Sequence, residues 1–135
     1  MLIDKLLRFS ASQSLAGASG TASTDILDLG ADRDMTALGR PLYVAVVLEA
    51  SGGTSPTLQV IVQTDDNSGF SSAVALHTGP ALAQASNRVQ IIPIPHTNER
   101  YLRLTYTQGG TSPTATVSAF ITDSPQAWQA TADGI

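Results

Sequence analysis

Apolar and polar residues alternate along much of this chain with the two-residue period of a β-strand. In segment 42–50, Leu42, Val44, Val46 and Leu48 share one face, and the opposite face is also largely apolar. In segment 88–95 the prolines cannot donate ladder hydrogen bonds, so the second half of that strand is expected at a sheet edge. The pattern predicts strands over residues 24–30, 42–50, 57–66, 73–78, 88–95, 99–107 and 114–122.

These short segments are separated by Gly, Pro, Ser, Asn and Asp, and none carries a 3.6-residue apolar stripe. They predict an all-β fold, an antiparallel β-sandwich. Immunoglobulin-type and jelly-roll sandwiches both fit, and the lack of a Cys–Trp–Cys pattern favours the jelly roll. The expected organisation is an extended N-terminal arm and polar loop at 1–23, the sandwich domain at 24–124 and an irregular C-terminal tail at 125–135.

The hexapeptide GGTSPT occurs twice, at residues 52–57 and 109–114, each time between two predicted strands. Glycine supplies positive φ and proline fixes the exit from a turn, so each copy is predicted to be a hairpin turn. A phosphate-binding loop would need a following helix and usually a lysine, and neither is present. Sequence identity ends with the hexapeptide, so it indicates one turn chemistry used twice.

Charge and composition argue against several classes of partner and site. The net charge is −4 and the seven basic residues are scattered, which disfavours nucleic acid as a partner. There is no cysteine, so disulfides and thiolate metal sites are excluded. Asp4, Lys5 and Arg8 interrupt the N-terminal apolar segment, so no secretory signal is expected, and no apolar run of ~20 residues predicts a membrane span.

Candidate chemistry is sparse. His77 and His96 lie in different segments, without the spacing of a metal site, and each is expected on a surface or loop. Segment 64–70, TDDNSGF, resembles part of a calcium loop but lacks the remaining ligands, so a turn is preferred. No GxSxG elbow is present, and Trp128 stands alone in the tail. We therefore expect no enzyme activity, no catalytic residues, no metal and no cofactor.

Three blocks carry a family resemblance: MLIDKLLRFS at 1–10, QTDDNSGFSS at 63–72 and TNERYLRLTY at 97–106. Together with DILDLGADRD and PLYVAVVLEA, in this order and spacing, they resemble the tailed-phage capsid cement or decoration proteins, typified by that of a short-tailed Bordetella phage. The resemblance implies a jelly roll without catalytic activity. It also implies binding to the outer surface of the major capsid protein shell, across subunit boundaries.

On this basis the expected protein is a structural virion component, made in the host cytoplasm, that cements neighbouring capsid subunits against internal pressure. It would bind the major capsid protein and itself, as a dimer or trimer. A carbohydrate- or receptor-binding module of a phage fibre is the alternative, although the tyrosines are few. The N-terminal apolar cluster either packs in its own core or docks on a partner. The candidate capsid or self-association contacts are Leu2, Ile3, Asp4, Leu6, Leu7, Arg8 and Phe9.

Overall fold

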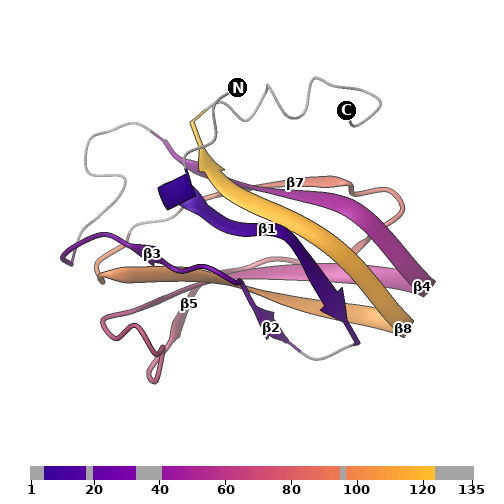
Figure 1. The fold of residues 1–135 in the computed structure, drawn as a ribbon, viewed down its shortest axis with the longest axis horizontal. Coiled ribbons are helices and arrows are strands. Elements are labelled where there is room, and N and C mark those ends of the chain that lie inside the picture. The colour runs from indigo at the N-terminus through magenta and orange to yellow at the C-terminus, as the bar shows by residue number, and fades with distance from the viewer. Residues whose placement is uncertain (1–4, 18–19, 33–40, 95–96, 124–135) are drawn as a thin grey trace.

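The computed structural model describes residues 5–17, 20–32, 41–94 and 97–123 (Figure 1). Apart from one short 3-10 helix, its regular elements are antiparallel strands of one sheet, which confirms the all-β class. The sheet alone does not establish a jelly roll, which stays a prediction. The elements are η1 (Lys5–Leu7), β1 (Arg8–Ala16), β2 (Thr21–Ala22), β3 (Leu27–Asp28), β4 (Tyr43–Asp65), β5 (Val74–Thr78), β6 (Leu82–Ala83), β7 (Val89–Pro93) and β8 (Tyr101–Thr122).

Two long strands, β4 and β8, form the spine of the sheet. They pair along their whole length, from Tyr43 opposite Thr122 to Asp65 opposite Tyr101. Near the middle of this ladder the sheet folds back, and its two halves lie one above the other (Figure 1). The first layer has the strand order β7, β4, β8, β1, and uses residues 43–51 and 114–122 of the long strands. The second layer uses their other halves, with β5 and β6 beside β4 and with β2 and β3 beside β8.

The prediction that the GGTSPT segments are hairpin turns is wrong. Each copy lies inside a long strand, and the two copies pair with each other: Gly52 lies opposite Thr114, and Thr57 opposite Gly109. The register shifts on both sides of Thr54, as at β-bulges, where strands bend and change sheet. The predicted strands on either side of each hexapeptide are therefore the two halves of one strand. Gly and Pro mark this corner, where the sheet folds, and do not mark a chain reversal.

The core lies between the two layers and is built from the side chains that alternation predicted to point inward. The buried phenol of Tyr106, from the second layer, is 2.8 Å from the hydroxyl of Ser10 in the first layer. This contact shows that the inner faces of the two layers meet. The long strands contribute to the apolar core cluster the residues Val44, Val46, Leu48, Leu58, Val60, Val62, Leu102, Leu104, Tyr106, Ala115, Val117, Ala119 and Ile121.

The folded domain begins earlier than the sequence indicated. The polar segment 10–23 was expected as a loop or extended arm, but most of β1 and all of β2 lie within it. Phe9 and Leu15 are 1% and 2% exposed and anchor β1 in the core. Because β1 pairs with β8 from Arg8 onward, the N-terminal segment is an edge strand of the first layer. The predicted tail at 125–135 lies outside the described residues.

Candidate interaction surface

The structure separates the candidate N-terminal contacts into two groups. Phe9 is buried in the chain's own core, and Leu7 packs against that core from its edge. Leu6, in η1, is 78% exposed and is the most exposed large apolar side chain among the described residues. Leu2, Ile3 and Asp4 lie outside the described residues. Core packing therefore accounts for Phe9, whereas Leu6 lies at the surface where a partner could reach it.

Arg8 stands at the start of β1, opposite Phe120 in the ladder with β8. Its side chain is half-buried, and its Nε atom is buried without a hydrogen-bond partner. A buried donor without an acceptor is unfavourable, because the bond that it made to water has not been replaced. Arg8 thus has unused hydrogen-bonding capacity close to the exposed Leu6.

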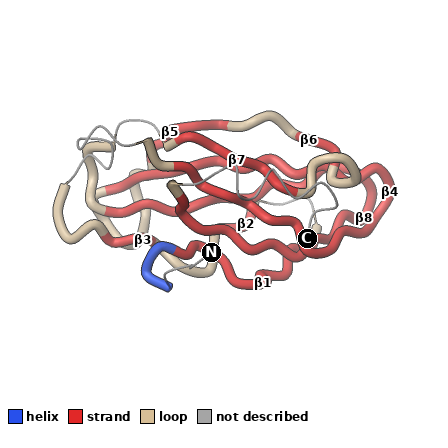
Figure 2. The backbone as a smooth tube through the Cα atoms, turned by 90° about the horizontal axis from the view of Figure 1, so that it is seen from above, coloured by secondary structure: helices blue, strands red, loops and turns tan. Residues whose placement is uncertain are grey.

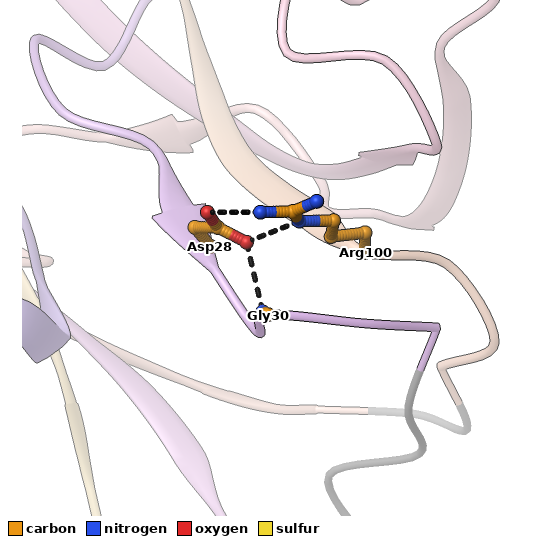
Figure 3. A network of polar contacts seen from close by, with 3 residues as sticks. All are labelled: Asp28, Gly30 and Arg100. Carbon is orange, nitrogen blue, oxygen red and sulfur yellow. Dashed lines mark hydrogen bonds and ion pairs between the residues drawn. The ribbon is translucent and has the colours of Figure 1, made fainter.

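An ion pair pins β3 to the start of β8 (Figure 3). The guanidinium of Arg100 donates to both carboxylate oxygens of Asp28, at 2.7 and 3.0 Å, and the Gly30 amide donates to one of them at 2.8 Å. The Arg100 and Gly30 bonds hold the pKa of Asp28 at about 2. Arg100 also lies over the Tyr101 ring. Both side chains are partly exposed, and the pair links β3 to the residue that precedes β8.

The TDDNSGF segment forms a turn, as expected. The carboxylate of Asp65, only 1% exposed, accepts hydrogen bonds from the amides of Asn67 and Ser72 at 3.1 and 2.7 Å. Burial by itself would raise the pKa of Asp65, but these N–H groups hold it below its ordinary value, whereas the hydrogen bond and charge of Asp65 raise the pKa of Asp66. Backbone donors thus hold both Asp65 oxygens inside the turn. Among the described residues, no three His, Cys, Asp or Glu side chains gather in a way that could hold a metal ion.

A groove of about 330 Å³ lies between the edge strands of the two layers. All five residues of β7 line it, so it runs along the edge of that strand: a hollow over one face would touch only alternate residues. Figure 2 shows β7 next to the segment that carries β5 and β6 along one long side of the molecule. The complete lining is His77, Gly79, Pro80, Leu82, Asn87, Val89, Gln90, Ile91, Ile92 and Pro93.

Sequence reasoning placed Pro93 at an edge, and β7 does pair with β4 alone. It did not find the groove, because the groove requires β5 and β7 to be neighbours across two layers. His77 lines the groove, in agreement with its expected surface position, and His96 lies outside the described residues.

The opposite long side of the molecule is closed by hydrogen bonds. There β1 is the edge of the first layer, and β2 and β3 are the edge of the second. The Gln13 side chain donates to the carbonyl of Ala22 and accepts from the amide of Thr24, both at 2.9 Å, and the Asp25 amide donates to the carbonyl of Phe9 at 2.9 Å. Hydrogen bonds therefore join the two layers on one long side of the molecule, whereas the groove separates them on the other.

The three tyrosines do not gather on one surface. Tyr106 is buried in the core. Tyr43 alternates with the buried Val44 of the first layer, and Tyr101 alternates with the buried Leu102 of the second. Their side chains therefore point outward from different layers. Trp128 lies outside the described residues.

The Bbp16 family model matches residues 9–121, from the second residue of β1 to the penultimate residue of β8. The chain belongs to the Bbp16 family. This family bears the name of a Bordetella phage protein, and membership indicates a phage virion-related structural protein. A comparison of this Bbp16 family member with curated proteins gives no match. In the part of the chain that the structure describes, no helix has the length and apolar character to cross a bilayer.

Proposed function

We propose that this protein is a capsid cement protein. It binds the outer surface of a phage head, bridges neighbouring subunits of the major capsid protein and opposes rupture of the shell under the pressure of packaged DNA. It acts without catalysis and associates with itself as a dimer or trimer on the shell. The observation that carries the proposal is the Bbp16 match, which spans nearly the whole folded sheet and agrees with the resemblance to cement proteins.

The architecture supports this role. A cement protein acts as a rigid clamp, and here both layers share two strands that run through the fold without interruption. Separating the layers would expose the core that is packed between them and would straighten both strands at the corner. Binding of many copies stabilises the assembled shell by mass action, and weak individual contacts are multiplied by the symmetry of the head.

The alternative, a carbohydrate-binding module of a phage fibre, has less support. Sugar rings bind to aromatic side chains that share one exposed face, whereas Tyr43 and Tyr101 point outward from different layers and Tyr106 is buried. A glycan array probed with the purified chain tests this alternative directly. Specific sugar binding would favour the fibre module.

Imaging of purified particles of the phage tests the main proposal. We expect the chain on the outside of the head, at a copy number comparable to that of the major capsid protein. Heads that lack the chain should rupture at lower temperature or lower osmotic shock than complete heads. Absence of the chain from virions, or its location on a tail fibre, would refute the proposal.

A further inference from the structure

The backbone groups of β7 divide into two sets. The Leu48 amide donates to the carbonyl of Arg88 at 2.8 Å, and the Ile94 amide donates to the carbonyl of Leu42 at 3.0 Å. In an antiparallel ladder, successive residues direct their N–H and C=O groups to opposite sides. Even-numbered positions of the strand therefore bond to β4, and the backbone groups of Val89, Ile91 and Pro93 face the other way.

The outward groups face the groove. Since proline has no N–H, the donors on this edge are the amides of Val89 and Ile91, two residues apart, and both residues are only half-buried. The carbonyls of Val89, Ile91 and Pro93 are the matching acceptors. This spacing is the one that an added β-strand requires.

The far wall of the groove is held in place. The Gly79 amide donates to the carbonyl of Val60 at 3.0 Å, and the Gln59 side chain donates to the carbonyl of Gly79 at 2.9 Å. The Asn87 side chain donates to the carbonyl of Ala83 at 2.9 Å. A groove with fixed walls loses little conformational freedom when it is filled, which favours binding.

The lining also selects the occupant. None of the ten lining residues is Asp, Glu, Lys or Arg, so a charged side chain buried here would find no ionic partner. The occupant is therefore an uncharged, extended segment. The β7 edge of a second copy is joined to its own layer and carries its own groove wall, so it would bring that wall into the same space. A single segment of another polypeptide enters without this conflict.

We propose that the groove is a strand-addition site, in which an extended, uncharged segment of the capsid subunit pairs with the outer edge of β7. This inference rests on the proposed function, because it takes the shell as the partner. It adds a defined attachment point to that function, on the side of the molecule opposite the edge where β1 is bonded to the second layer.

The substitution Ile91→Pro tests the site. It removes one outward donor and keeps every ladder bond to β4, because the Ile91 amide faces away from β4. Proline is tolerated on the open side of an edge strand, and the preceding residue stays extended. Ile91→Val keeps the amide and most of the side chain and is the matched control. Each full-length chain is titrated onto heads assembled without this protein, and bound chain is measured after sedimentation.

We expect Ile91→Pro to bind about tenfold more weakly or worse, and Ile91→Val to bind within about twofold of the unsubstituted chain. Hydrogen exchange provides an independent readout that needs no variant: head-bound protein should protect two more amides in the segment around β7 than free protein. Equal binding by an Ile91→Pro chain with a native unfolding midpoint, or no added protection on heads, would overturn the site. Failure of the unsubstituted chain to bind heads at all would instead refute the proposed function, and the site with it.

Discussion

Gly53→Ala probes the corner where the sheet folds. Gly53 has a φ of 101°, and a β-carbon there would lie 2.6 Å from the carbonyl oxygen of Ser112 and 2.8 Å from that of Thr111. A side chain at such a φ costs about 1–3 kcal/mol. Forcing atoms into occupied space costs about 1–3 kcal/mol more, and here the neighbours are backbone atoms that cannot rotate away. We expect a loss of about 4 kcal/mol in the free energy of unfolding.

That loss is large compared with the roughly 5–15 kcal/mol that stabilises a typical domain. For a chain of this size it corresponds to a fall in Tm of about 12 °C. Urea unfolding followed by far-ultraviolet circular dichroism measures it. The midpoint should fall with an unchanged slope, because the surface exposed on unfolding stays the same.

Gly30→Ala is the matched control. Gly30 also has a positive φ, 81°, but a β-carbon there would meet nothing within 4 Å. Only the backbone effect applies, which is about 1–3 kcal/mol. If Gly53→Ala were no more destabilising than Gly30→Ala, the two hexapeptides would not be packed against each other. Two separate, exposed hairpin turns would give equal losses of stability for Gly53→Ala and Gly30→Ala.

Three further predictions concern the N-terminus and two polar contacts. Deleting residues 1–6 should leave the unfolding midpoint nearly unchanged, because Leu7, Phe9 and β1 are kept, but it should weaken sedimentation of the chain with heads. Leu6→Ser should reproduce part of that loss, and unchanged binding would exclude the N-terminal contact. Arg100→Ala should raise the pKa of Asp28 from about 2 toward 3.8, which an NMR titration of its carboxyl measures. The stabilisation from the pair is present above the unfolded pKa and is lost as the pH falls toward 2. The free energies of unfolding of the variant and the parent should therefore converge in acid. Burial raises the pKa of Tyr106 above its ordinary 10, so the free energy of unfolding should fall as the pH rises past 10. Tyr106→Phe should cost about 1 kcal/mol at neutral pH and reduce that alkaline loss. If urea unfolding of Tyr106→Phe gave the same pH profile as the parent, the burial of the phenol would be contradicted.

The alternation of apolar residues predicted the inward face of the sheet correctly. Val44, Val46 and Leu48 share a face in the sequence pattern and are all buried in the core. This succeeds because side-chain direction in a strand depends only on local geometry. The edge position of Pro93 was predicted for the same kind of reason, since a missing amide is a local property.

The corner could not be predicted in the same way. Gly-Gly followed by Pro is compatible both with a hairpin turn and with a bulge inside a strand. What decides between them is that residues 52–57 lie opposite residues 109–114, which is a contact between distant parts of the chain. The same holds for β1, whose polar residues have little strand preference of their own and form a strand because β8 lies beside them.

The corner of β4 separates the strands that form the two walls of the groove. Gly53 meets the backbone of the second hexapeptide, and Gly110 meets the backbone of the first, with carbonyl oxygens 2.6–2.8 Å from the position that a β-carbon would take at each glycine. These close contacts require glycine at both positions, because a β-carbon at either one would overlap a backbone carbonyl oxygen. The corner divides β4 into a half that pairs with β7, at residues 43–47, and a half that pairs with β5, at residues 61–64. The two glycines lie outside the lining of the groove, but they belong to the bend that places its walls, β7 and β5, in different layers.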